Sequence, residues 1–157
     1  MELTHRTSLD VDAPAQTVYA LVSDVTRTGE WSPTCRSCEW DDPAQQGVGA
    51  QFSGHNETTE RRWSTRSTVV AAVPGREFAW EVGQGYVRWA YLLTPREGGT
   101  ELTHTWEFTD AGQRYFEQTY RPDAPAQIAQ RTAAAREDMP RTLAAIRDIA
   151  ERDHADR

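Results

Sequence analysis

The chain has 157 residues and a formal net charge of −7, with 17 basic against 24 acidic side chains. This length is typical of one domain, and an acidic chain without a basic block is a poor candidate for binding nucleic acid or an anionic membrane. Six Trp, five Tyr and four Phe argue against disorder, and no apolar run approaches the roughly 20 residues of a membrane-spanning helix.

The N-terminal segment alternates apolar and polar residues from Leu3 to Val11, which predicts a half-buried strand. The tetrapeptide that begins at Asp12 then indicates a helix start, with an N-cap candidate and a proline in the first turn. The buried stripe of this helix is expected to consist of Val18, Leu21, Val22 and Val25. A second short helix is predicted over residues 24–31.

Six further strands are predicted between residues 36 and 108, separated by turn residues. Their ranges are 36–40, 49–56, 62–73, 77–82, 86–94 and 100–108. The connections are short, so consecutive strands must pair antiparallel. One face of these strands is aromatic and the other is charged, which indicates a sheet covered on one side only.

The C-terminal region is predicted to be an irregular stretch that follows Asp110 to Gly112, and then one long helix. The predicted inward line of this helix is Ile128, Thr132, Ala135, Met139, Leu143, Ile146 and Ala150. Pro140 removes one backbone hydrogen bond and predicts a kink, and residues 152–157 are expected to form a frayed tail. The whole chain is therefore predicted to be one α+β domain, a curved seven-stranded antiparallel sheet wrapped around the long helix.

Cys35 and Cys38 form a C-x-x-C pair, which is typical of a redox dithiol or of half a zinc site. A zinc site needs two more ligands, and His55 is the nearest candidate and stands alone. A redox pair usually begins a helix, whereas an extended segment follows here. We expect reduced thiols with a structural role and no metal site, with redox chemistry as an alternative.

The aromatic residues of the strands predict a binding surface. The expected ligand-binding set is Phe52, Trp63, Phe78, Trp80, Trp89, Tyr91, His104 and Trp106 from the strands, with Met139 and Leu143 from the helix. Aromatic rings lining a concave surface suit flat apolar ligands. A solid aromatic core is the alternative, and a cavity is favoured because the helix turns small side chains such as Ala129 and Thr132 inward.

His104 lies on the predicted inward face between Leu102 and Trp106. It is either a hydrogen-bonded core residue, which we favour, or an acid or base that works near neutral pH. His5 has the inward parity of the first strand and is a possible neighbour of His104, because these strands are expected to pair.

Several segments resemble the START-like, birch-pollen-allergen-like superfamily of helix-grip proteins (SRPBCC), and within it the bacterial polyketide cyclase/dehydrase-like group. They are Asp12 to Val25, Glu30 to Pro33, Gly49 to Asn56, Val73 to Trp80, Arg88 to Pro95 and Gly98 to Phe108. The resemblance implies a helix-grip fold with an internal cavity, in a group that includes cyclases and lipid carriers. Cyclases of this plan carry an inward arginine, whose position falls on Val70 here, and the nearest arginine, Arg66, has outward parity.

The sequence thus predicts a protein that binds a hydrophobic, aromatic or polycyclic small molecule without a cofactor. The first alternative is a polyketide cyclase, aromatase or dehydrase that uses the same cavity, with His104 or Tyr91 moving protons. The second is a protein-interaction module like the chaperone-activating relatives of this fold. No secretory signal is visible, so we expect a cytoplasmic monomer or homodimer that binds neither nucleic acid nor membrane.

Overall fold

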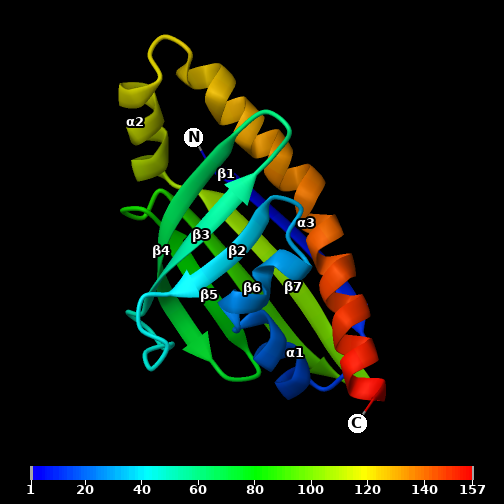
Figure 1. Ribbon diagram of the computed structural model, residues 1–157. Helices are drawn as coiled ribbons and strands as arrows, with labels where there is room; N and C mark the ends of the chain where they lie inside the picture. The colour runs from blue at the N-terminus through cyan, green and yellow to red at the C-terminus, as the bar shows by residue number, and fades with distance from the viewer. Residues whose placement is uncertain (1, 157) are drawn as a thin grey trace.

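The computed structural model describes residues 2–156, in which one curved sheet holds a long helix on its inner side (Figure 1). The elements in chain order are β1 (Leu3–Val11), α1 (Ala15–Val22), η1 (Val25–Glu30, a 3₁₀ helix), β2 (Cys35–Trp40), β3 (Gln51–Glu57), β4 (Arg62–Val73), β5 (Glu77–Val82), β6 (Val87–Arg96), β7 (Gly99–Phe108), α2 (Asp110–Thr119) and α3 (Ala124–Ala155). No helix of residues 2–156 is long and apolar enough to cross a membrane.

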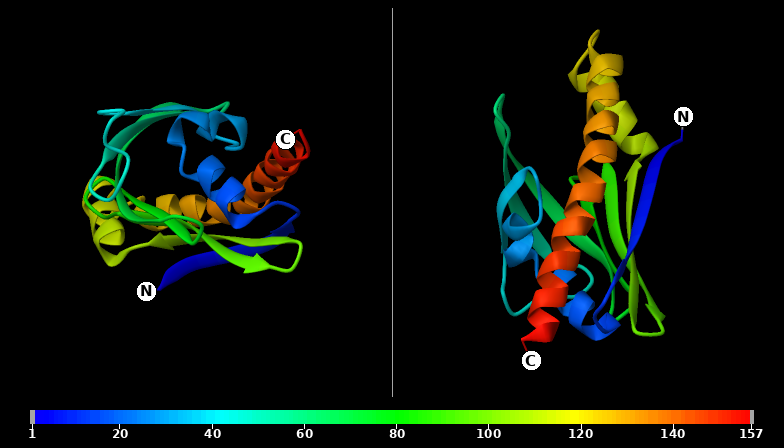
Figure 2. Two further views of the ribbon diagram at one scale, coloured as in Figure 1. Left: turned by 90° about the horizontal axis from the view of Figure 1, so that it is seen from below. Right: turned by 90° about the vertical axis from the view of Figure 1, so that its right-hand side faces the viewer.

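The seven strands form one antiparallel sheet in the order β1-β7-β6-β5-β4-β3-β2. Strands β1 and β2 are therefore the two edges, although they are neighbours in the sequence. The segment between them, α1 and η1, lies inside the curve of the sheet (Figure 2, left). The predicted α+β helix-grip architecture is confirmed, and the predicted ranges of β1, β4 and β5 match those of the structure.

Helix α3 runs along the sheet beside β1 and β7 (Figure 2, right). Its buried face contains Ala135, Met139, Leu143, Ile146 and Ala150 of the predicted line, whereas Ile128 and Thr132 are half-buried. The prediction that Ala129 faces inward is wrong, because this residue is exposed. The small inward side chains of the helix are therefore fewer than the sequence suggested.

Helix α3 also continues through Pro140 and extends to Ala155, so residues 152–155 are helical rather than frayed. Contacts with the N-terminal region hold this end of the helix. The Glu151 carboxylate accepts a hydrogen bond from the backbone N–H of Asp12 at 2.9 Å, and Asp153 lies 3.5 Å from Arg27. Asp12 therefore contacts α3 and does not cap α1, which begins at Ala15 after Pro14.

The structure contains one helix that the sequence analysis missed. Residues 110–119 form α2, where an irregular stretch was predicted. Its N-terminus is capped by the Thr109 hydroxyl, which accepts a hydrogen bond from the Gly112 N–H at 3.0 Å. The Phe116 ring of α2 packs edge-on against Phe108 with ring centroids 4.9 Å apart. This contact supplies the apolar face that stabilises a short helix.

Candidate functional site

Four rings from three neighbouring strands form a stack at the centre of the concave face. Trp80 of β5 is stacked with Trp89 of β6 at a centroid distance of 6.4 Å. The Trp89 ring lies 5.2 Å from His104 of β7, and His104 is nearly parallel to Tyr91 at 4.3 Å. The strand register explains the stack, because Trp80 pairs with Trp89 and Tyr91 with His104. Side chains directly opposite each other share one face of a sheet.

The ring contacts continue from this stack toward the β2 edge of the sheet. Phe52 of β3 lies 6.3 Å from Trp80, and Trp40 of β2 lies 5.4 Å from Phe52 in an edge-on arrangement. Phe78 lies 5.9 Å from Trp80. We call the seven rings Trp40, Phe52, Phe78, Trp80, Trp89, Tyr91 and His104 the aromatic array. Its rings come from five strands, β2, β3, β5, β6 and β7, on both sides of β4 in the sheet.

The remaining predicted residues lie at the margins of the aromatic array. Trp106 packs with Met139 in a buried cluster that Trp89 also contacts, and Leu143 belongs to the cluster that holds Tyr91. Trp63 lies apart from the aromatic array, near the end of the β3–β4 hairpin, under the Arg61 guanidinium at 3.8 Å from the ring centroid. The structure thus brings nine of the ten predicted residues together, with Trp63 at the periphery.

His104 is a buried neutral side chain in this arrangement. It is 3% exposed, and its Nδ1 lies 2.9 Å from the Ala90 carbonyl oxygen. Burial lowers the pKa of His104 to about 4, and the hydrogen bond to Ala90 opposes this effect by raising the pKa. The carbonyl requires a proton on Nδ1, so Nε2 carries the free lone pair at neutral pH. His5 pairs in register with Trp106 rather than with His104.

Tyr91 is the other buried polar group of the aromatic array. Burial raises the pKa of its hydroxyl, and a hydrogen-bond interaction with the Trp31 side chain acts in the opposite direction. The hydroxyl therefore stays protonated at neutral pH and is able to donate a hydrogen bond. Tyr91 and Trp31 belong to one buried cluster, so the packing fixes the position of the hydroxyl.

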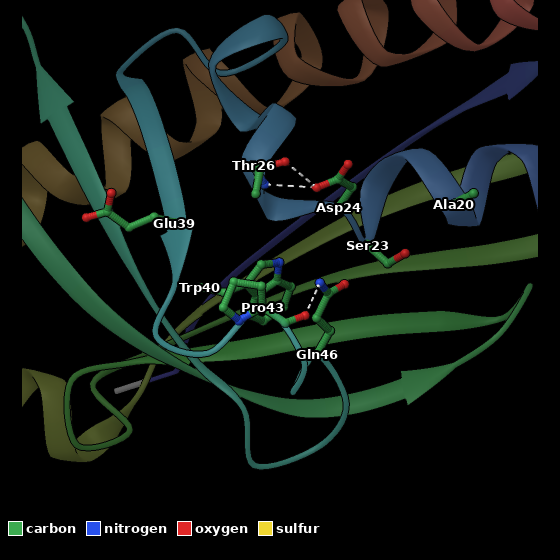
Figure 3. A pocket seen from close by; sticks show the side chains of 8 residues that line it. All are labelled: Ala20, Ser23, Asp24, Thr26, Glu39, Trp40, Pro43 and Gln46. Carbon is green, nitrogen blue, oxygen red and sulfur yellow. Dashed lines mark hydrogen bonds between the residues drawn. The ribbon is translucent and has the colours of Figure 1, made fainter.

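An open pocket of about 570 Å³ lies between α1–η1 and β2 with the loop that follows β2 (Figure 3). Its walls are mixed in polarity, with Ser23, Asp24, Glu39 and Gln46 beside the apolar Ala20 and Pro43. Trp40 lines the same pocket, and its buried indole N–H has no hydrogen-bond partner among residues 2–156. Since the Trp40 ring also contacts Phe52, it separates the pocket from the rest of the aromatic array.

The sequence analysis missed this pocket and the position of Trp40 in its wall. A second pocket, of about 400 Å³, lies at the β6–β7 turn beside Pro14 and His154. None of the ten predicted ligand-binding residues lines either pocket. The predicted rings instead contact one another, while Trp63, Trp80 and Trp89 remain half-buried. The part of the concave face around these three tryptophans is thus incompletely covered.

Two arginines lie at the end of the molecule where the β3–β4 hairpin and the start of α3 are found (Figures 1 and 2). Arg61 stacks on Trp63, and Arg131 lies 5.5 Å from the Phe116 ring centroid. Partial burial lowers the pKa of Arg61, and the positive charge of Arg131 lowers it further. Neither arginine forms an ion pair within the described part of the chain. This end therefore carries two unpaired positive charges.

No arginine occupies the inward position that cyclases of the helix-grip plan use. Val70 is half-buried beside a register shift between Val69 and Ala71. Arg66 is exposed, as its parity predicted, and forms an ion pair with Asp41 at 2.6 Å on the outer face. The interior charge that would polarise a bound carbonyl is therefore missing from this position.

Comparisons with known proteins agree with this geometry. The model of the family described as polyketide cyclase/dehydrase and lipid transport matches residues 3–148. The solution structure of the Polyketide_cyc-like protein Cgl2372 from Corynebacterium glutamicum is 48% identical, with a TM-score of 0.73 over 96% of this chain and 93% of that one. No curated protein sequence matches the chain.

Two aromatase/cyclase structures share the fold at low sequence identity. The Zhui aromatase/cyclase from Streptomyces sp. R1128 is 19% identical, with a TM-score of 0.71 over 97% of this chain and 95% of that one. The di-domain ARO/CYC StfQ of the steffimycin biosynthetic pathway is 15% identical, with a TM-score of 0.70 over 99% of this chain and 52% of that one. On the match of the family model, the chain belongs to the polyketide cyclase/dehydrase and lipid transport family.

Proposed function

We propose that the protein binds a planar hydrophobic small molecule against the aromatic array and acts as a binding or carrier protein. The observation that carries this proposal is the stack of Trp80 and Trp89, which is half-buried on the concave face. Flat rings that are partly exposed there offer apolar area to a flat ligand and stack with it. Family membership supports the same class of ligand.

The polar groups beside the aromatic array suit a ligand that carries a few oxygen atoms. The Tyr91 hydroxyl supplies a donor, the free Nε2 of His104 an acceptor, and the unpartnered N–H of Trp40 a second donor. The pocket next to Trp40, at about 570 Å³, falls within the roughly 300–1,000 Å³ of typical small-molecule sites. We infer that a ligand enters through this pocket and displaces the Trp40 ring.

Arg61 and Arg131 would give the site a preference for a ligand that carries an acidic substituent. The net charge of the protein is −7, yet these two guanidiniums have no carboxylate partner within residues 2–156. A carboxylate held between two arginines forms charge-assisted hydrogen bonds and relieves the repulsion between them. A planar aromatic acid is therefore the proposed ligand class.

Titration with anthraquinone-2-carboxylate, a flat aromatic acid, tests the proposal. We expect quenching of tryptophan fluorescence and a higher thermal midpoint. A ligand at 100 times its Kd stabilises the native state by about 2.7 kcal/mol. For a domain of this size, this corresponds to about 5 to 11 °C. Trp89→Leu should abolish both effects, whereas Tyr115→Leu, which removes an exposed ring of α2, should preserve them. Absence of both effects with anthraquinones, flavonoids and fatty acids would refute the proposal.

A cyclase or aromatase is the second candidate function, favoured by the buried Tyr91 hydroxyl beside the neutral His104 ring. In that case the array would fold a flexible poly-β-ketone chain and Tyr91 would donate a proton to a carbonyl oxygen. Tyr91→Phe should then lower turnover of a poly-β-ketone thioester at least about 100-fold while the substrate still quenches fluorescence. Equal turnover by the variant and the wild type would exclude this role of Tyr91.

The interaction-module alternative has no comparable support. The large apolar side chains that are most exposed among residues 2–156 lie in three different segments: Val48 in the β2–β3 loop, Val73 on β4 and Tyr115 on α2. A docking surface for a partner protein is normally one continuous apolar patch. A cytoplasmic location and a monomeric or homodimeric state remain predictions, which cell fractionation and light scattering check.

A further inference from the structure

The two cysteines lie on the same face of β2 because of a β-bulge. On a regular strand, a spacing of three residues would place Cys35 and Cys38 on opposite faces. The pairing of β2 with β3 shifts its register between Cys35 and Ser37, so one extra residue is inserted there. Both thiols consequently point inward, where Cys35 is 8% exposed and Cys38 is half-buried.

The surroundings hold the two sulfur atoms next to each other. The Sγ atoms are 3.3 Å apart, and Cys35 Sγ also lies 3.3 Å from the Ser37 carbonyl oxygen. The Ser32 hydroxyl accepts a hydrogen bond from the Cys35 N–H at 2.9 Å, which fixes the backbone before the bulge. Gly54 of β3 pairs with Cys38 and has no side chain, so both sulfur atoms occupy the space beside it.

We propose that Cys35 and Cys38 form a redox-active dithiol that a hydroperoxide converts reversibly to an intramolecular disulfide. The Cys35 thiolate attacks the terminal oxygen of the hydroperoxide, the O–O bond breaks, and the alcohol leaves with one proton. The Cys35 sulfenic acid then reacts with the Cys38 thiol, which forms the S–S bond and releases water. Two thiols are oxidised by two electrons and one hydroperoxide is reduced to an alcohol and water. Reduction by an external dithiol restores both thiols.

Local electrostatics assigns the two roles. The hydrogen bond from the Cys38 thiol lowers the pKa of Cys35, burial opposes this effect, and hydrogen bonds with the backbone of His55 and Ser37 lower it again. The same Cys35–Cys38 interaction, together with burial, raises the pKa of Cys38. Cys35 is therefore the attacking thiolate and Cys38 the resolving thiol.

The charged and titratable groups around the pair come from three strands. His55 of β3 lowers the pKa of Cys35, and Glu39 of β2 raises the pKa of Cys38. The two thiols in turn raise the pKa of Tyr91 of β6. From η1, the Thr28 side chain interacts with Cys38 by a hydrogen bond. No group of three or more potential metal ligands gathers within residues 2–156, which favours disulfide chemistry over a zinc site.

Formation of the disulfide would move the parts of η1 and β2 that line the open pocket. The two sulfur atoms have to approach by about 1.2 Å to reach the length of an S–S bond. Gly29 of η1 packs directly against the Arg36 carbonyl oxygen inside the bulge, so a shift of the bulge toward η1 would displace η1. Glu39 and Trp40, which line the open pocket, follow Cys38 in the chain.

Treatment of the reduced full-length protein with hydrogen peroxide, followed by intact mass measurement and thiol titration, tests the proposal. We expect the loss of two hydrogen atoms per chain and a fall from two free thiols to none, reversed by dithiothreitol. In the Cys38→Ser variant the reaction should stop at the Cys35 sulfenic acid, which dimedone traps. The Cys35→Ser variant should form no sulfenic acid with hydrogen peroxide and should therefore not react with dimedone. Oxygen addition to the wild type or disulfide-linked dimers in place of the internal disulfide would overturn the proposal.

A matched variant tests the contribution of the bulge. The double substitution Ser37→Cys with Cys38→Ser keeps two cysteines in the segment and moves the second thiol to an exposed position of β2. We expect this variant to form no internal disulfide at the peroxide concentration that oxidises the wild type. An equally rapid internal disulfide in the variant would show that chain proximity alone drives the reaction and would overturn the role assigned to the bulge. Circular dichroism verifies that each variant is folded.

Discussion

Replacement of His104 by glutamine should make the stability of the protein less sensitive to acid. The folded protein keeps His104 neutral, with a pKa of about 4 against 6.5 for a free histidine. Below pH 6.5 the unfolded chain therefore binds a proton that the folded chain does not bind, and the free energy of unfolding falls as the pH falls toward 4. One pKa unit corresponds to about 1.4 kcal/mol, so His104 alone should remove about 3 kcal/mol between pH 7 and pH 4.

Thermal unfolding of the wild type and of His104→Gln at pH 7, 6, 5 and 4 measures this contribution of His104 to the pH dependence of stability. Glutamine retains an N–H donor for the Ala90 carbonyl and does not titrate, and every other ionisable group is common to both proteins. The midpoint of the wild type should therefore fall by about 6 to 12 °C more than that of the variant over this range. The variant is expected to be the less stable protein at pH 7, because the ring stack with Tyr91 is lost. Parallel pH curves for the two proteins would refute the conclusion that His104 is buried in its neutral form.

Three further substitutions test other parts of the structure. Gly99→Ala places a Cβ against the Val11 carbonyl oxygen between the paired strands β1 and β7, and should cost about 1 to 3 kcal/mol in urea denaturation; an unchanged midpoint would contradict the close approach. Arg66→Gln removes the exposed ion pair with Asp41 and exposed hydrogen bonds to Ser53 and Gln51, so the denaturation midpoint should move little at physiological salt. Trp40→Phe removes the unpartnered N–H and should weaken binding of a carbonyl-bearing probe about two- to tenfold in fluorescence titration, whereas equal affinity would show that this N–H faces no ligand.

Most of the sheet was predictable from the sequence because most of its strands alternate and its turns contain glycine, whereas β2 and β4 each contain a register shift. Gly75 and Gly98 have φ angles of 73° and 80°, which other residues rarely adopt. Gly75 follows β4 at its predicted end, whereas β6 extends to Arg96, beyond its predicted end at Thr94. Helix α2 was missed because its apolar face consists of a few rings and because Gly112 suggests a turn. The contact of Phe116 with Phe108, which stabilises this helix, joins segments that a local pattern does not connect.

The inward face of β2 was not predictable for a different reason. Simple alternation places Cys35 on the face opposite to Cys38 and Trp40, and only the register shift at Ser37 brings all three to the interior. The bulge depends on the pairing with β3 and on the packing of Gly29 against it, and neither leaves a local pattern in the sequence. The proximity of the two thiols follows from this one irregularity.

The chemistry open to a bound molecule follows from the charges of the concave face. Position 70 is a valine, His104 is neutral, and Tyr91 is protonated at neutral pH. The aromatic array therefore supplies neither a cation to stabilise an enolate nor a charged base, but it does supply a hydroxyl donor, an imidazole acceptor and a set of flat surfaces. An enzyme with this site would accelerate its reaction mainly by orientation, as in the ring closure of a flexible chain whose reacting carbons it brings together. The base that the aromatic array offers is the neutral His104 imidazole, whose pKa of about 4 makes it a weak base for the removal of a carbon-bound proton.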